Sequence, residues 1–198
     1  MTEYAIPSRE AAWDTLCEFT KTENLRKHAL AVELCMRALA RHYNEDEEKW
    51  GVIGLLHDFD YEKFPTIPEH SIEGAKILLE RGWPEDMVHA MMGHANHTNI
   101  PRDTLMAKAL YAVDELSGLL IGAALVRPDK SFKEMKVSSV KKKLKNKAFC
   151  RAVNRDEVVE GTVELGWELD ELIGFLIGEL SKVEESLGLG VVATSGSE

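Results

Sequence analysis

Hydrophobic residues recur every three or four positions along most of this chain, a spacing that predicts amphipathic α-helices. The first such segment runs from Arg9 to Lys21, and Ser8 precedes it as a capping residue. A second is predicted from Leu25 to about Tyr43, with Asn24 as its cap. Its apolar stripe consists of Leu25, His28, Val32, Cys35 and Leu39. No segment has the period-two alternation of a half-buried strand, so we expect an all-α protein.

The rest of the chain continues in the same way between short loops. Acidic residues 45–48 suit the first turn of a third helix, which carries the apolar run Trp50–Leu56 and ends near His57. Two prolines make 60–68 a loop. Later helices are predicted over 69–82, 84–94, 103–126, a lysine-rich stretch after Ser138, a segment capped by Asn154 or Asp156, and 169–187.

The balance of charge excludes one broad class of function. A net charge of -10 at pH 7 argues against a protein that binds nucleic acid polymers, because such proteins need a cationic surface. The segment Lys130–Lys147 departs from this balance, with eight lysines and a single acidic residue, Glu134. Two interpretations stay open for it: a rim that attracts an anionic substrate, or a solvated helix face.

Cysteine usage and the absence of targeting segments indicate the compartment. Three cysteines, Cys17, Cys35 and Cys150, form no close pair in the sequence, and an odd number suits a reducing environment. The first eight residues have neither the basic nor the apolar region of a signal peptide. No run approaches the roughly 18 apolar residues of a membrane span. We therefore expect a cytoplasmic protein that does not enter a membrane.

The dipeptide His57-Asp58 is the strongest chemical signal in the chain. It follows the apolar run 50–56, so an imidazole and a carboxylate enter a hydrophobic environment together. Burial of such a pair is costly unless a partner satisfies both groups. A divalent metal ion is such a partner, because it accepts neutral imidazole and ionised carboxylate as ligands.

Four other residues point to the same chemistry. His28 lies on the apolar stripe of the second helix, and Asp114 lies among apolar residues of the helix predicted over 103–126. His70 follows Pro68-Glu69 at a helix start, and His94 ends another helix. Each has an ordinary alternative: a core histidine bonded to a carbonyl, or a salt bridge for Asp114. Metal ligands spread over several helices are typical of sites inside helical bundles.

The arrangement resembles the HD superfamily of metal-dependent phosphohydrolases. The resemblance rests on His28, His57-Asp58 and Asp114, and the phrase Gly-Leu-Leu-His-Asp-Phe-Asp-Tyr-Glu-Lys is similar to a bacterial group of predicted hydrolases. It implies an all-α HD-domain helical bundle with the metal site in its core. We expect a single domain over 1–187, with its core at about 20–126, a C-terminal helical extension at 130–187 and a flexible tail at 188–198.

The resemblance also implies a ligand set. One metal ion would take His28, His57, Asp58 and Asp114. A second would take His70 and His94, with Asp58 bridging the two ions. His57 and Asp58 are then the catalytic residues, and a metal-bound hydroxide cleaves a phosphate ester or anhydride, with a nucleotide as the expected substrate. One or two divalent ions per chain are expected, and the choice among Mn, Fe, Co, Ni, Zn and Mg stays open.

Residues around the ligands give weaker signals. Lys63, Asp60, Arg127 and Lys130 are candidate substrate contacts, and Glu73 lies one helical turn from His70, where it could orient that imidazole.

Two other functions remain open, as does the oligomeric state. The same bundle with two irons could perform oxygen-dependent chemistry, as some HD relatives do. A non-catalytic nucleotide or metal sensor would keep the ligands without turnover. The amphipathic segment 169–187 could pack on its own domain or form a homodimer.

Overall fold

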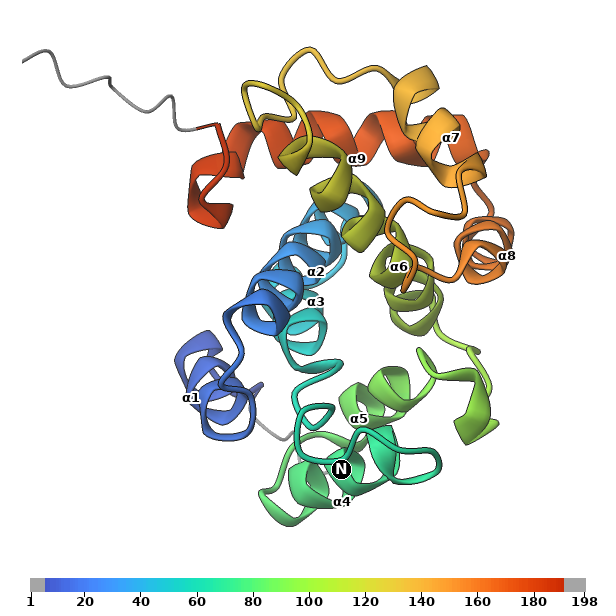
Figure 1. Ribbon diagram of the computed structural model, residues 1–198. Helices are drawn as coiled ribbons and strands as arrows, with labels where there is room; N and C mark the ends of the chain where they lie inside the picture. The colour runs from blue at the N-terminus through green and yellow to red at the C-terminus, as the bar shows by residue number, and fades with distance from the viewer. Residues whose placement is uncertain (1–5, 191–198) are drawn as a thin grey trace, which may run out of the picture.

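The computed structural model describes residues 6–190, which form an all-α bundle without strands, as the sequence predicts (Figure 1). In chain order its helices are α1 (Arg9–Phe19), α2 (Glu23–Tyr43), α3 (Glu47–Leu56), α4 (Glu69–Glu80), α5 (Glu85–Met92), α6 (Leu105–Leu125), α7 (Val137–Lys145), α8 (Arg155–Leu165) and α9 (Leu169–Val183), with 3-10 turns at Asn96–Thr98 and Glu184–Leu187. Of the tail expected at 188–198, residues 191–198 lie outside the described part of the chain, as do residues 1–5.

Side-chain caps set the start of several helices. Ser8, Asp46, Thr104 and Asn154 each accept a hydrogen bond from a backbone N–H of the first turn that follows. The expected cap Asn24 is wrong, because Asn24 lies inside α2, which begins at Glu23. Elsewhere the predicted boundaries differ from the observed ones by a few residues, since α5 ends at Met92 and α7 begins at Val137.

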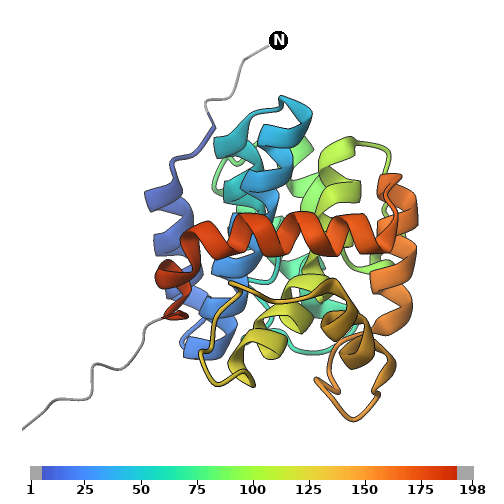
Figure 2. The ribbon, with the colours of Figure 1, turned by 90° about the horizontal axis from the view of Figure 1, so that it is seen from above.

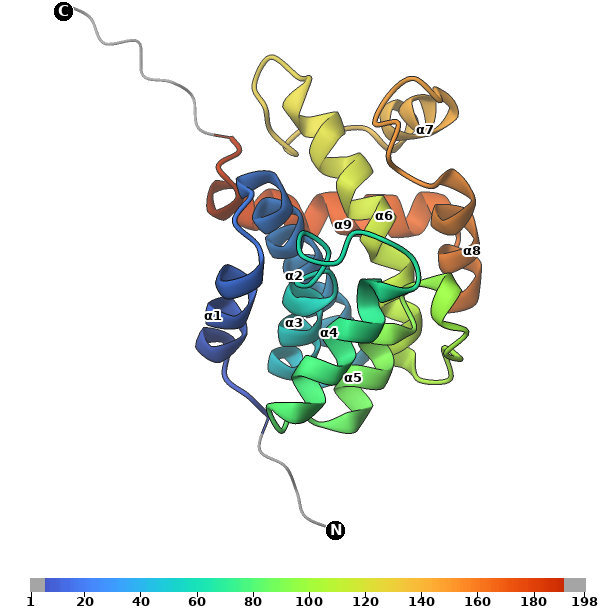
Figure 3. The ribbon, with the colours of Figure 1, turned by 60° about the horizontal axis from the view of Figure 1, so that its bottom comes forward.

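Helix α2 lies at the centre of the bundle and contacts α3, α6 and α9. Gly54 allows the close approach of α3, because a Cβ at this position would lie 3.1 Å from the Val32 carbonyl oxygen on α2. Helices α4 and α5 pack side by side at one end (Figure 3), and α5 also contacts α3 and α6. The ends of α3 and α5 and the middle of α2 and α6 are thereby brought into one region.

Helix α9 crosses one side of the bundle (Figure 2) and contacts α2, α7 and α8. Its apolar face buries Leu172, Ile173 and Leu176. Of the two alternatives for this segment, packing on its own domain is therefore observed. Within the described residues, no helix is both long and apolar enough to cross a bilayer.

Candidate metal centre

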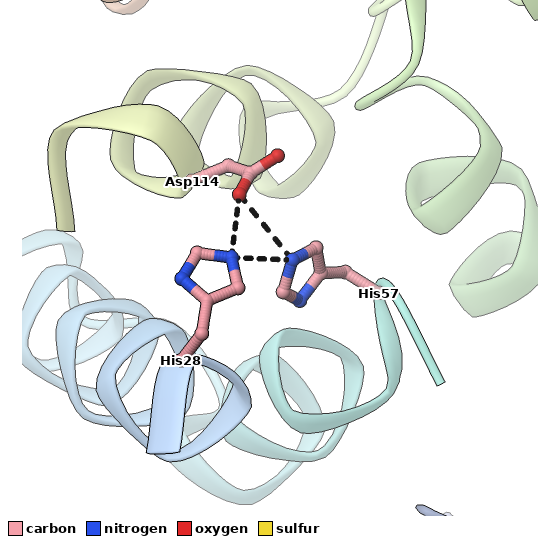
Figure 4. A group of neighbouring side chains, drawn as sticks. All are labelled: His28, His57 and Asp114. Atoms are coloured by element: carbon pink, nitrogen blue, oxygen red, sulfur yellow. Dashed lines mark hydrogen bonds and ion pairs between the residues drawn. The ribbon is translucent and has the colours of Figure 1, made fainter. Parts of the chain in front are cut away.

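Three side chains from distant parts of the sequence meet between α2, α3 and α6 (Figure 4). His28 comes from α2, His57 follows the last residue of α3, and Asp114 comes from α6. The Nε2 atom of His28 lies 3.0 Å from Asp114 Oδ1, and the Nε2 atom of His57 lies 3.3 Å from the same oxygen. The two Nε2 atoms are 3.2 Å apart. We call these residues the first His/Asp group.

A second His/Asp group adjoins the first and consists of Asp58, His70 and His94. The Nε2 atoms of His70 and His94 each lie 3.1 Å from Asp58 Oδ1. The other carboxylate oxygen, Asp58 Oδ2, lies 3.4 Å from His57 Nε2 in the first group. Asp58 therefore stands between the two groups with one oxygen facing each. All six residues that the sequence marks as metal ligands lie in these two groups.

The proton positions on the histidine rings bear on what the groups can hold. His57 Nδ1 donates to the Gly54 carbonyl oxygen at 2.8 Å, and His94 Nδ1 donates to the Met91 carbonyl oxygen. In the neutral ring the proton then sits on Nδ1 and Nε2 carries a lone pair. Lone pairs of nitrogen thus face carboxylate oxygens, an arrangement that needs a cation between them. The donor set, imidazole nitrogen with carboxylate oxygen, fits a divalent transition metal.

His70 is held by a carboxylate side chain instead of a backbone carbonyl group. Helix α4 is kinked at its start, where His70 is extended (ψ 140) and Ser71 has a left-handed backbone (φ 61). The His70 Nδ1 atom donates to Asp60 Oδ1 at 3.0 Å, and the backbone N–H groups of Ser71 and Gly74 donate to Asp60 Oδ2 at 3.1 and 3.0 Å. A Cβ at position 74 would lie 2.7 Å from Asp60 Cγ, so this position requires glycine.

Two expectations are corrected by this arrangement. Asp60, a candidate substrate contact, is fully buried and does not line the cavity, and its hydrogen bonds instead hold His70 in place. Glu73, expected to orient His70, forms an ion pair with Lys76 at 2.6 Å instead.

The histidines and aspartates of the two His/Asp groups shift one another's pKa values. Burial opposes protonation of His57, but the carboxylates of Asp58 and Asp114 outweigh burial and raise the pKa of His57 well above its usual value. Burial likewise opposes ionisation of Asp58 and Asp114, and the neighbouring histidines nevertheless hold the pKa of both below the usual range. Burial also lowers the pKa of His70, but Asp58 and Asp60 outweigh this effect and raise its pKa to about 9. The pocket thus favours positive charge, which protons or metal ions can supply.

Comparison with known proteins identifies the domain. Residues 25–119 match the family model of the HD domain. The chain contains an HD domain at these residues. No curated protein and no solved structure matches it. The matched range contains all six residues of the two His/Asp groups, and HD domains are metal-dependent hydrolase domains that bind divalent ions.

A cavity of about 670 Å³ opens beside the metal centre of this HD domain. Five of the six centre residues line it, and His57 lies beneath them, fully buried. The other walls come from the loop after α3, the turn after α5, helix α6 and the start of α8. They include Tyr61, Pro65, Ile67, Ala95, Asn96, His97, Glu115, Gly118, Ala152, Val153 and Glu157.

The remaining predicted substrate residues are not on these walls. Lys63 lies over the Phe19 ring, 4.8 Å from its centroid. Arg127 forms an ion pair with Asp129 at 2.8 Å, and the Lys130 carbonyl oxygen accepts a hydrogen bond from the Gly190 N–H. Charge and proximity in the sequence suggested these three residues, but the path of the chain does not bring them to the cavity walls.

Two acidic residues of the cavity were missed by sequence reasoning. Glu115 follows the ligand Asp114 directly, and that adjacency was a usable signal. Glu157 lies on α8, far from any motif, and only the packing of α8 on α6 brings it to the HD domain's cavity. Burial and Asp114 raise the pKa of Glu115 to about 7, and the same causes raise the pKa of Glu157.

Proposed function

We propose that this HD-domain protein hydrolyses a phosphate ester or anhydride of a small molecule with two divalent metal ions. His28, His57 and Asp114 would hold one ion, and His70 and His94 the other, with Asp58 shared between them. The observation that carries the proposal is the position of Asp58, whose two oxygens face the two groups at 3.1 and 3.4 Å. A shared carboxylate is typical of sites that bind a pair of metal ions.

The chain's own residues prepare the site for this chemistry. When bound, divalent ions lower the pKa of a coordinated water and offset the charge that develops on a phosphoryl group. In the neutral rings, the carbonyl groups of Gly54 and Met91 hold the proton on Nδ1 of His57 and His94, so that Nε2 points into the centre and can bind a metal ion. Asp60 does the same for His70. The cavity admits a substrate on the side of Asp58 and Asp114, and buried His57 closes the opposite side.

The cavity also bears on the substrate. A volume of about 670 Å³ is large enough for a nucleoside monophosphate, which keeps the expected nucleotide among the candidates. Within residues 6–190, no lysine or arginine lines the cavity. Each phosphate beyond the scissile one would therefore lack a cationic side chain, so we favour monoesters over polyphosphates. The free cysteines Cys17, Cys35 and Cys150 suit our proposal that the protein acts in the cytoplasm.

The first test is a count of bound metal by elemental analysis on protein purified without a chelating resin or an affinity tag. We expect about two ions per chain, one for each group. His94→Ala should lose the second ion, and His57→Ala should lose nearly all metal. His42→Ala, an exposed histidine, is the matched control. A protein that takes up no Mn²⁺ or Fe²⁺ would contradict the proposal.

The second test is hydrolysis of a panel of phosphate monoesters, diesters and anhydrides with and without Mn²⁺. Release of phosphate by the native chain should be abolished in Asp58→Ala and retained in Asp14→Ala, which removes an exposed carboxylate from α1. Oxygen uptake is recorded in parallel, because consumption of oxygen without phosphate release would indicate the di-iron alternative. Bound nucleotide with neither activity would indicate a sensor.

A further inference from the structure

Two carboxylates of the cavity belong to neither His/Asp group. Glu115 projects from α6 and Glu157 from α8, and both line the cavity. Glu157 accepts a hydrogen bond from the neutral side chain of Asn96, whose Nδ2 lies 3.2 Å from Glu157 Oε1, and the backbone of Asn154 lies near the Glu115 carboxylate. Among residues 6–190 neither forms an ion pair, whereas Glu164, further along α8, is paired with Arg102 at 2.7 Å.

The position of these two carboxylates determines what a ligand bound at the metal centre can contact. They share one cavity with Asp58 and Asp114, so the organic part of a molecule bound at the centre can lie against them. Partly buried carboxylates are stabilised by an opposite charge or by several hydrogen-bond donors, because their own solvation is weak. No side chain of the described cavity wall supplies a lysine or arginine for them.

We propose that the organic part of the substrate carries an ammonium group, which Glu115 and Glu157 receive while the phosphate lies at the metal centre. The two glutamates are then specificity-determining residues, and the substrate class is an amine-bearing phosphomonoester. This inference rests on the proposed phosphohydrolase function. A purely anionic ligand would bring its own negative charge against both carboxylates, whereas an ammonium group neutralises them and leaves the phosphate to the metal ions.

The test compares pairs of substrates that differ in one charge. A series of aminoalkyl phosphates of increasing chain length is measured beside alkyl phosphates in which a methyl group replaces the ammonium. The native chain with Mn²⁺ should prefer the best amine by about 10-fold or more in kcat/KM, a ratio typical of one well-placed charge pair. Glu157→Gln and Glu115→Gln should each reduce this preference toward unity. Asp156→Asn, an exposed carboxylate one residue from Glu157, should keep it.

A binding measurement separates this inference from the proposed function. Calorimetric titration of the metal-loaded protein uses aminoalkyl phosphonates and their methyl counterparts, which cannot be hydrolysed as esters. Two outcomes overturn the inference but leave the proposed hydrolase function standing. In one, esters are hydrolysed without any preference for the amine. In the other, the preference is unchanged in both glutamate variants. If no ester is hydrolysed, the proposed function fails. In that case the substrate assignment fails with it. An ammonium preference of the phosphonates that the glutamine variants lose would still show that the two glutamates bind an ammonium group.

Discussion

At the scale of single residues, the site depends on which nitrogen of each histidine carries a proton. His57 and His94 both follow the end of a helix, and each donates Nδ1–H to the carbonyl group three residues earlier, in Gly54 and Met91. Local chain geometry therefore selects the tautomer that presents Nε2 to a metal. His70 begins a helix and has no such carbonyl, so buried Asp60 takes that role.

The first prediction concerns Asp60. Asp60→Asn keeps an acceptor for His70 but places a neutral amide where one carboxylate oxygen accepts from two backbone N–H groups. We expect the affinity of the second His/Asp group for Mn²⁺ to fall by about 10- to 100-fold, as for other residues that orient metal ligands. Glu73→Gln, on the same segment but paired with Lys76, should change little. Calorimetric titration of Mn²⁺ measures both, and unaltered affinity in Asp60→Asn would refute the positioning role.

The second prediction concerns pH and the metal-free protein. His70 has its pKa raised from 6.5 to about 9 in the fold, and the pKa of His57 is raised too. A raised pKa stabilises the fold below the unfolded value and loses that contribution as pH rises through the folded value. The free energy of unfolding should therefore decline between pH 6.5 and about 9 without metal. Urea unfolding measures it, and added Mn²⁺ should reduce the decline by replacing the protons. A stability that rises over this range would contradict the assignment.

At the scale of elements, the packing of α8 on α6 brings Glu157 to the cavity that Asp114 and Glu115 of α6 also line. Gly161 is the contact point: a Cβ there would lie 2.7 Å from Ala112 Cα and 3.0 Å from the Tyr111 carbonyl oxygen. Both are backbone atoms, which cannot rotate away as a flexible side chain could. The sequence of α8 alone does not reveal this requirement, because the atoms that would clash belong to α6. Glycine is otherwise unfavourable inside a helix.

The third prediction uses two helical glycines as a matched pair. Gly161→Ala should destabilise the protein by about 1–3 kcal/mol, because α8 must move away from α6. Gly178→Ala, on α9, meets no atom within 4 Å and should stabilise by up to about 1 kcal/mol through helix propensity. Thermal unfolding followed by circular dichroism gives both signs. Equal effects of the two substitutions would show that helix propensity, and not the α6–α8 contact, governs position 161.

At the scale of the whole molecule, the metal centre links much of the bundle. The six residues that would hold the ions come from α2, the end of α3, the start of α4, the turn after α5, and α6. An ion bound there contacts elements far apart in the sequence and only in the folded state, so binding and folding are coupled.

The fourth prediction follows from that coupling. Mn²⁺ at about 100 times its dissociation constant should stabilise the fold by about 2.7 kcal/mol, which raises Tm by about 5–10 °C for a chain of this size. A chelator should reverse the change. Asp58→Ala should lose most of the increase and Asp14→Ala should keep it. Differential scanning calorimetry measures the shift, and an equal shift in Asp58→Ala would place the stabilising ion elsewhere.

The sequence by itself determined the helical class and most helix positions, because periodicity and capping are properties of neighbouring residues. It also indicated the six residues of the two His/Asp groups, through their donor chemistry and through the resemblance to the HD superfamily. Tertiary structure alone decided that Asp58 stands between the groups, that Asp60 holds His70, and that Glu157 reaches the cavity. It also decided that Lys63, Arg127 and Lys130 do not line the cavity. These facts depend on how helices cross and how loops turn, and such geometry arises from packing between segments that the linear sequence keeps apart.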